Sequence, residues 1–273
     1  NGEVDVHLQV AGTQASPFLP LFPTARFVRW DVMIHSSFND CGKVRRMSVS
    51  VGPVPKLGLE LGNLEGIAES ALELAMTSRG SRLLQLAIES ATTSIQDTII
   101  ARLQGRIWDV AASPHGNHVL QKFIVAAPGV SALVIASELS GRAVAAAQHK
   151  TRSRVLERLL EHCVLEEVFH LVEELLGSAV SLCRDPFGNF VMQRLLEHSG
   201  PEHRHRAALA IVPHVCKLAR HRQANNVVRA AIAHCAMEDR VLLADTLKAD
   251  RRGLAGLAKH IVGSFVAREL RLS

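Results

Sequence analysis

From Leu64 to the C-terminus, apolar residues return at intervals of three and four, the spacing that places them on one face of an α-helix. Within residues 142–177 this pattern predicts three consecutive helices, over Ala143–Ala147, Ser153–His162 and Leu165–Leu176. Turn signals rich in glycine and proline separate this segment from similar segments before and after it. We therefore expect a series of short helices grouped in threes.

The middle helix of this group has one apolar face and one polar face. Because successive helical residues turn by about 100°, the apolar face consists of Val155, Leu156, Leu159 and Leu160, and the polar face of Ser153, Arg154 and Glu157. The same division recurs in the groups on either side. The apolar face is expected to pack into a core and the polar face to remain at the surface.

The polar face of the middle helix belongs to a five-residue pattern that repeats along the chain. Each copy begins 36 residues after the previous one, except the last, which follows after 39. The copies are Ser81-Arg82-x-x-Gln85, Asn117-His118-x-x-Gln121, Ser153-Arg154-x-x-Glu157, Asn189-Phe190-x-x-Gln193, Asn225-Asn226-x-x-Arg229 and Ser264-Phe265-x-x-Arg268. A fixed period of this length is typical of stacked repeat proteins.

The period and the helices together predict the architecture. A single three-helix unit cannot bury its own apolar surface, so neighbouring units must stack. We expect an all-α fold, a curved α-solenoid of about six three-helix repeats. All the middle helices then line one surface. Their polar residues form what we call the ladder, in which the first, second and fifth residues of one pattern make one rung.

The first 60 residues differ from the rest. Prolines at 17, 20, 23, 53 and 55 interrupt them, and no helical period holds. One or two short strands are possible, such as Arg26–Ile34. We predict an irregular N-terminal segment over residues 1–60 and a repeat domain over residues 61–273.

Composition narrows the possibilities further. Apolar residues make up 48% of the chain, aromatic residues only 4%, and tyrosine is absent, which favours packed helices over a sheet. Residues 61–273 carry 25 of the 31 basic and 21 of the 26 acidic residues, and a net charge of +4 permits an anionic partner without requiring one. Five cysteines without a CxxC motif suit a reducing intracellular compartment. No apolar run is long enough to cross a membrane.

The ladder has a simple explanation, which is that it is only the solvated face of each helix. Three observations favour a function instead. The rungs keep their register through five units without an insertion, and their pairs are mostly Asn with Gln or Ser with Glu. The middle residue is often flat, and an exposed phenylalanine such as Phe190 is useful for stacking on a base.

These residues resemble the Pumilio/FBF (PUF) family of RNA-binding repeat proteins. The resemblance covers about residues 64–273 and is carried by the segments His115–Lys122, Ser153–Cys163, Asp185–Arg194 and Ala224–Arg229. It implies a crescent of repeats whose concave face reads one base of single-stranded RNA per repeat. The first and fifth residues would then contact base edges: Ser81, Gln85, Asn117, Gln121, Ser153, Glu157, Asn189, Gln193, Asn225, Arg229, Ser264 and Arg268. The middle residues would stack: Arg82, His118, Arg154, Phe190, Asn226 and Phe265.

The family's recognition code also implies bases. Asn with Gln implies uracil, Ser with Glu guanine and Ser with Gln adenine. Since the family binds RNA antiparallel to the protein, the rungs from Asn189 back to Ser81 imply the core 5′-UGUA-3′. The family usually has eight repeats where this sequence shows six. By neighbouring residues Asn225 matches the family's penultimate repeat, so the core is shifted by two repeats. Ser264 with Arg268 resembles a cytosine-reading pair.

The resemblance implies a sequence-specific binder of messenger RNA 3′-untranslated regions. It would act in post-transcriptional regulation and translational repression by recruiting regulatory proteins. We expect a cytoplasmic monomer with no cofactor, no metal and no enzymatic activity, since no catalytic motif occurs. Two alternatives stay open. One is a PUF-like ribosome-biogenesis factor, nucleolar and with weak sequence preference. The other is a protein-binding scaffold of the HEAT or armadillo kind.

We also make predictions for several charged groups outside the ladder. The run Glu202–Arg206 predicts a solvated or phosphate-facing loop and not a metal site. The pairs Glu166-Glu167 and Glu173-Glu174 are expected on an outer solvated face. Four basic residues lie just before the middle helices: Lys150, Arg152, Arg220 and Arg222. It is equally possible that they contact backbone phosphate and that they are simply solvated.

Overall fold

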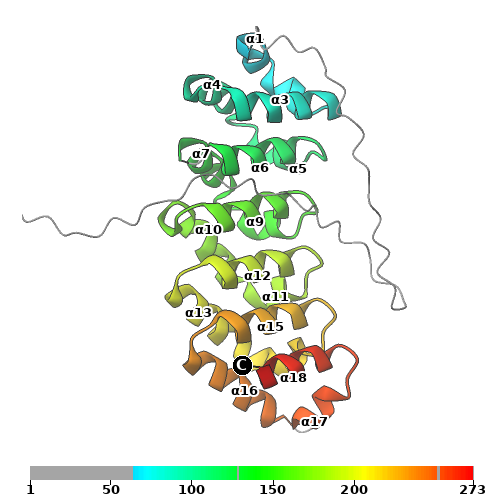
Figure 1. Ribbon diagram of the computed structural model, residues 1–273. Coiled ribbons are helices and arrows are strands. Elements are labelled where there is room, and N and C mark those ends of the chain that lie inside the picture. The colour runs from blue at the N-terminus through cyan, green and yellow to red at the C-terminus, as the bar shows by residue number, and fades with distance from the viewer. Residues whose placement is uncertain (1–63, 128, 251–252, 273) are drawn as a thin grey trace, which may run out of the picture. The chain divides into compact units, whose positions relative to one another are not determined.

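The computed structural model describes residues 64–127, 129–250 and 253–272. The described part is a stack of helical units that runs from the top to the bottom of Figure 1. It contains α-helices and one short 3₁₀ turn, and no strand occurs among these residues. The predicted irregular segment 1–60, with the possible strand Arg26–Ile34, lies outside the described residues.

Each complete unit has a short first helix, a second helix and a third helix. The first helices are α2 (Ala71–Ala75), α5 (Ile107–Ala112), α8 (Ala143–Ala147), α11 (Ala179–Arg184), α14 (Val215–Leu218) and α17 (Gly253–Ala258). The second helices are α3 (Ser78–Ser90), α6 (Gly116–Ala126), α9 (Arg152–His162), α12 (Gly188–His198), α15 (Ala224–His234) and α18 (Gly263–Leu272). The third helices are α4 (Thr93–Leu103), α7 (Val130–Leu139), α10 (Leu165–Gly177), α13 (Pro201–Ile211) and α16 (Met237–Lys248).

Two further elements complete the described part. The short α1 (Leu64–Glu69) packs against α4, in the way that each third helix packs against the next. The 3₁₀ turn Val212–His214 joins α13 to α14. For residues 142–177 the predicted helices agree with the observed ones to within one residue, because both the apolar period and the turns that bound it are local features.

One continuous apolar core runs through the stack. Val155, Leu156 and Leu159 of α9 are fully buried, and the equivalent residues of the other second helices join them in the same cluster. The second helices pack side by side in chain order, from α3 to α18. The third helices form a second row, to the left of the second helices in Figure 1. The fold is therefore an all-α solenoid, as predicted, and every polar face of the ladder belongs to one row of adjacent helices.

Glutamates of the third helices hold the start of the first helix of their own unit. Both oxygens of the Glu174 carboxylate in α10 accept hydrogen bonds from backbone N–H groups, those of Gly141 and Ala143 at the start of α8. Glu138 does the same for Gly105 and Ile107 at the start of α5, 36 residues earlier. Gly105 and Gly141 have φ angles of 79° and 76°, which favour glycine. The prediction that Glu174 lies on a solvated face is therefore wrong.

The segment Glu202–Arg206 is helical and not a loop. Pro201 and His203 lie in the first turn of α13, and His203 is 5% exposed. His205 lies 2.6 Å from Asp239, and Arg206 forms two hydrogen bonds with Glu173. The prediction failed because His203 and Arg206 meet Glu173 of α10, and His205 meets Asp239 of α16. No local pattern in the sequence reveals these partners on other helices. Among the described residues no group of metal-ligating side chains occurs, and none of the described helices could cross a membrane.

Candidate functional site

The register of the ladder is set by a capping residue four positions before each rung. The side chain of this residue accepts hydrogen bonds from backbone N–H groups at the start of the second helix, which lack partners within the helix. Asp185 accepts from Phe187 and Gly188 at 2.8 Å, and Ser113 accepts from Gly116 at 3.1 Å. The same role belongs to Thr77, His149, His221 and His260. Sequence reasoning missed these caps, although they recur at the same interval as the rungs, 36 residues and finally 39.

The first residue of each rung is anchored by the backbone of the loop before it. Asn117 Nδ2 donates to the carbonyl of Ser113 at 2.7 Å, and Asn189 Nδ2 donates to Asp185 at 2.9 Å. Asn225 is held in the same way by His221 and Arg222. These asparagines are buried, so the rung begins below the surface and not on it. Because the amide nitrogen is used in this contact, the Oδ1 atom is the one that faces the next turn.

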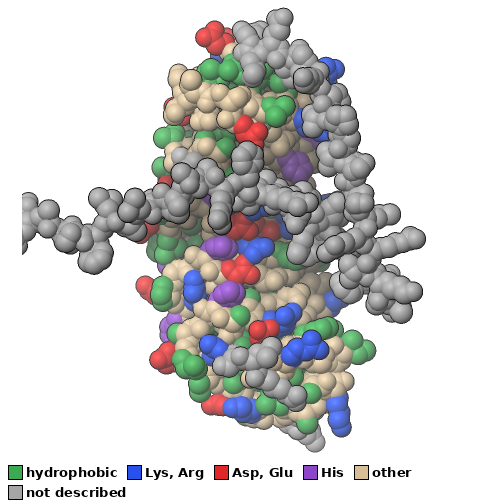
Figure 2. Space-filling view, in the orientation of Figure 1, with side chains coloured by type: hydrophobic (Ala, Val, Ile, Leu, Met, Phe, Trp, Pro, Cys, Tyr) green, Lys and Arg blue, Asp and Glu red, His purple; other side chains and the backbone are tan. Residues whose placement is uncertain are grey.

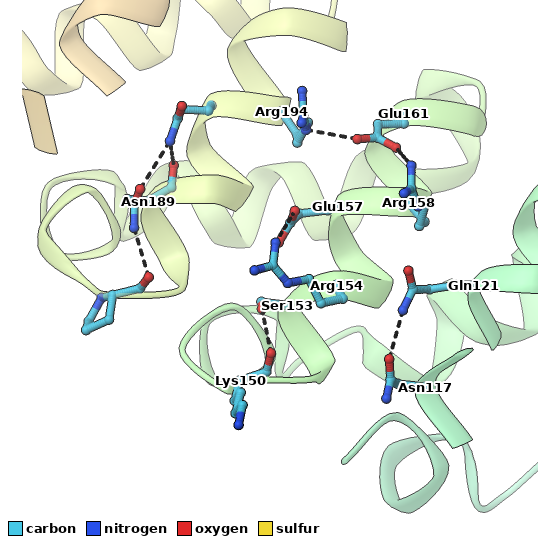
Figure 3. Close-up of polar contacts among 12 residues, drawn as sticks. Asn117, Gln121, Lys150, Ser153, Arg154, Glu157, Arg158, Glu161, Asn189 and Arg194 are labelled. Atoms are coloured by element: carbon cyan, nitrogen blue, oxygen red, sulfur yellow. Dashed lines mark hydrogen bonds and ion pairs between the residues drawn. The ribbon is translucent and has the colours of Figure 1, made fainter. Parts of the chain in front are cut away.

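The fifth residue completes the rung by bonding the first. Gln121 Nε2 donates to Asn117 Oδ1 at 2.8 Å, and Gln193 Nε2 donates to Asn189 Oδ1 at 3.1 Å. Figure 3 shows the Asn117–Gln121 contact on α6. Both glutamines are half-buried, and each keeps its carbonyl oxygen for another partner. Gln121 also keeps one N–H donor, whereas Gln193 Nε2 makes a second contact, with the backbone carbonyl of Asn189 at 3.1 Å. The pair of Asn117 and Gln121 can therefore offer a donor and an acceptor side by side to a flat polar group.

The serine rungs differ from each other, and only the rung of Ser81 is a shorter version of the same arrangement. Ser81 Oγ donates to the backbone carbonyl of His115 in the next unit at 2.8 Å, and Gln85 Nε2 donates back to Ser81 Oγ at 3.1 Å. Ser153 Oγ lies 3.5 Å from the carbonyl of Lys150 (Figure 3). Ser81 and Ser153 are buried. Because serine is short, these rungs leave more room than the asparagine rungs.

Glu157 makes its rung different from the others. Its carboxylate is 8% exposed and accepts from Arg154 Nη1, which lies 3.2 Å from Oε1 and 3.0 Å from Oε2. Burial raises the pKa of Glu157, and the guanidinium of Arg154 opposes that shift. The rung thus holds a buried carboxylate beside its own predicted stacking residue.

The predicted stacking residues all lie on the same row of second helices, with different exposure. Arg82 and His118 are exposed, Arg154, Phe190 and Asn226 are half-buried, and Phe265 is 46% exposed. Desolvation and the neighbouring His115 lower the pKa of His118, which favours a neutral, flat ring at neutral pH. These side chains present planar groups beside the polar pairs of each rung.

The last two rungs depart from the pattern. Asn225 is anchored as the other asparagines are, but the guanidinium of Arg229 binds Glu269 of α18 at 3.2 Å. Ser264 Oγ donates to the carbonyl of Ile261, and Arg268 is exposed. The structure therefore joins the first and fifth residues by a hydrogen bond in the rungs of Ser81, Asn117 and Asn189. In the other rungs these residues bond to other partners or are exposed.

A row of ion pairs runs beside the ladder, one helical turn further along. Arg194 of α12 binds Glu161 of α9 at 2.9 Å, and Arg158 pairs with Glu161 within α9 (Figure 3). Within α12, Arg194 also pairs with Glu197. Lys122 of α6 pairs with Glu89 of α3 in the same relative position. Acidic, basic and histidine side chains mix over this part of the surface in Figure 2. These pairs link neighbouring second helices and balance the charge next to the rungs.

Two of the basic residues before the second helices already have partners. The guanidinium of Arg152 lies 3.8 Å from the ring centroid of Trp108, and Arg142 lies 4.2 Å from the same ring. Arg220 bonds Asp250 at 2.7 Å and the carbonyl of Cys216 at 2.8 Å. Neither Arg152 nor Arg220 is simply solvated, whereas Lys150 and Arg222 are exposed.

Comparisons with known proteins identify the same repeats. A family model described as Pumilio-family RNA binding repeat matches residues 70–103 and 106–140, and one described as NOP9-like PUF repeat domain matches residues 143–267. The boundaries of the first two matches correspond to the units containing α3 and α6. No curated protein sequence gives a significant match.

Solved structures share the fold. The Puf3 RNA-binding domain bound to a Cox17 RNA 3′ UTR site is 21% identical with a TM-score of 0.70, covering 76% of this chain and 59% of that one. PUF-8 in complex with PBE-RNA is 20% identical with a TM-score of 0.72, covering 76% and 62%. Yeast Puf5p bound to SMX2 RNA is 17% identical with a TM-score of 0.66, covering 76% and 60%.

The chain therefore spans about three fifths of the length of the solved structures that it matches. The two family models together account for residues 70–140 and 143–267 apart from two residues between repeats. Their units coincide with the helical units described above, from α2 to α18. On these matches and this fold, the chain belongs to the PUF family of α-helical repeat proteins.

Proposed function

We propose that this protein binds single-stranded RNA along the ladder and reads its sequence one base per rung. The observation that carries the proposal is the amide pair of Asn117 and Gln121, repeated 36 residues later by Asn189 and Gln193 with the same internal hydrogen bond. A helix face that is merely solvated has no need of a buried asparagine anchored by backbone. The pairing leaves a donor and an acceptor at a fixed place, which suits the edge of a base.

The proposed core sequence is 5′-UGUA-3′. The Asn189/Gln193 and Asn117/Gln121 rungs take uracil, Ser153/Glu157 takes guanine and Ser81/Gln85 takes adenine. Glu157 supports the guanine assignment because a buried carboxylate is an acceptor for the N–H groups of a base. We assign base-edge roles also to the first and fifth residues of the last two rungs, where Arg229 and Arg268 replace the amide. The residues Arg82, His118, Arg154, Phe190, Asn226 and Phe265 are proposed to stack.

The proposed biological role is post-transcriptional. The Puf3 RNA-binding domain is bound to a 3′ UTR recognition sequence in the solved structures, and by this likeness we propose that this protein binds messenger RNA 3′-untranslated regions in the cytoplasm. Repression would follow from regulatory proteins that it recruits. The protein is proposed to act as a monomer without catalysis or a cofactor.

One observation favours a second candidate function. The NOP9-like model covers residues 143–267, which include three complete rungs and all of a fourth except Arg268. A ribosome-biogenesis factor of the PUF type, with weak sequence preference and a nucleolar location, is therefore the alternative. A protein-binding scaffold is less favoured, because it has no need of amide pairs held in register.

Selection of RNA ligands from a random pool by the full-length protein tests the proposal. We expect enrichment of UGUA, followed by tighter binding of a UGUA oligomer than of its scrambled form in a fluorescence titration. The DNA version and a duplex should bind more weakly. Enrichment without a shared sequence would favour the alternative, and equal affinity for the UGUA and scrambled oligomers would exclude sequence reading by the ladder.

A further inference from the structure

Arg154 takes part in two contacts at once, and both lie at the rung of Glu157. Its Nη1 atom donates to both carboxylate oxygens of Glu157, at 3.2 and 3.0 Å. Its Cζ atom lies 5.1 Å from the ring centroid of Phe190, the stacking residue of the next unit. Figure 3 shows the guanidinium turned toward the carboxylate and not away into solvent. The side chain thus bridges two second helices, α9 and α12.

The first contact resembles the one that guanine would make. A guanidinium is planar and carries N–H donors that fit a carboxylate. The edge of guanine that carries N1–H and the 2-amino group has the same arrangement of donors around one carbon. In the absence of RNA, Arg154 therefore occupies both carboxylate oxygens of Glu157, from Nη1 alone, where guanine would donate from two nitrogens.

The second contact closes the space that the base would use. A base stacked between two planar groups needs about two van der Waals separations, roughly 7 Å in all. The 5.1 Å between the guanidinium of Arg154 and the ring of Phe190 is shorter than that. A base can enter between these two residues only after Arg154 moves.

We propose that Arg154 is an internal substitute for guanine, which closes the Ser153/Glu157 rung in the RNA-free protein and is displaced by the incoming base. This inference rests on the proposed base-reading function and deepens it at one rung. Opening the rung without a replacement would leave the carboxylate of Glu157 buried and unpaired, which is costly. Guanine presents two adjacent N–H groups to the carboxylate, so it restores what Arg154 gives up.

The chain offers a matched comparison at another rung. Arg82 occupies the same position beside Ser81, but its fifth residue is the neutral Gln85, which is bonded to Ser81. Arg82 is exposed, whereas Arg154 is half-buried against its partners. Replacing either arginine by phenylalanine keeps a flat stacking group and removes the guanidinium. Only the replacement of Arg154 also removes a group that competes with the base for Glu157.

The test is a fluorescence titration of the full-length wild type, Arg154→Phe and Arg82→Phe with UGUA and UAUA oligomers. For each variant, the quantity compared is its affinity for UGUA divided by that of the wild type. We expect this ratio to be roughly threefold to tenfold higher for Arg154→Phe than for Arg82→Phe, as release of one charged contact implies. If Arg154→Phe folds poorly, the second variant is Arg154→His, which introduces the residue type found at the equivalent position, His118. A thermal unfolding curve decides which of the two is used.

Two results would overturn the inference, and they differ from each other. If all proteins prefer UGUA over UAUA but the two affinity ratios are equal, Arg154 does not compete with guanine, and the proposed function stands. If no protein distinguishes UGUA from UAUA, Glu157 does not read guanine, and the proposed base reading fails at this rung together with the inference. A higher ratio for Arg154→Phe with retained guanine preference supports both.

Discussion

The side-chain amide of Gln121 donates a hydrogen bond of 2.8 Å to Oδ1 of Asn117, one helical turn before it. Asn117 in turn is fixed by the backbone carbonyl of Ser113, so the position of Gln121 is determined by the loop before α6. The relation recurs in α12 between Gln193 and Asn189. A rung is therefore a short hydrogen-bonded series that begins in the backbone and ends at the surface.

Exchanging the chemistry of one rung should exchange its base. The double change Ser153→Asn and Glu157→Gln reproduces the pair found at Asn117 and Gln121, and should switch the preferred core from UGUA to UUUA. The discrimination gained should be that of one base contact, roughly 1–3 kcal/mol. Titration of both proteins with both oligomers measures it. The same base preference in the two proteins would show that this rung does not read a base.

Phe190 should matter for binding more than for stability. It is half-buried on the ladder face, opposite the buried Val191 and Met192. Phe190→Ala should weaken RNA binding by about 1–3 kcal/mol, the usual range for stacking on a base. The melting temperature should change little. Leu195→Ala is the control, since this leucine is fully buried and its loss should cost roughly 2–5 kcal/mol of stability. A comparable loss of stability in Phe190→Ala would place its ring in the core.

The cap at His149 should make the stability of its unit depend on pH. Nδ1 of His149 accepts from the backbone N–H of Thr151 at 3.2 Å, which requires an unprotonated nitrogen. Desolvation and the charge of Arg152 lower the pKa of His149 below 6.5 in the folded protein. The unfolded chain therefore binds the proton more readily, so the stabilisation is complete above about pH 6.5 and is lost as the pH falls from there towards the folded-state pKa.

His149→Ser places at this cap the residue found at Ser113, which accepts without titrating. We expect the melting temperature of wild type to fall more than that of His149→Ser between pH 7.5 and pH 5.5. Thermal unfolding followed by circular dichroism at several pH values measures this difference. Parallel curves for the two proteins would mean that His149 does not cap α9 through its neutral form.

Glu174 should stabilise the junction between units, whereas Glu166 on the same helix should not. Glu174 accepts from two backbone N–H groups at the start of α8, and Glu166 is exposed. Glu174→Ala should cost about 1 kcal/mol, the usual value of a lost cap. Glu166→Ala should leave the melting temperature nearly unchanged. Equal effects in denaturant unfolding would contradict the capping role.

Much of the fold was predictable because it depends on local pattern. The helical period of residues such as Val155 and Leu159 identifies the core face, and the interval of 36 residues identifies the units. The positions of the ladder follow from the same period, since residues one turn apart on a helix share a face. Both family models agree with this division into units.

The sequence by itself determined an all-α solenoid of stacked units and the helix face on which the ladder lies, since a repeated amphipathic helix has only one way to bury its apolar side. Only the tertiary structure decided what each polar residue does there. The capping of α8 by Glu174 depends on how the first and third helices of one unit pack. The burial of Asn189 and the contact of Arg154 with Phe190 depend on how closely neighbouring units approach. That approach is set by packing between residues about 36 positions apart, and no local pattern encodes it.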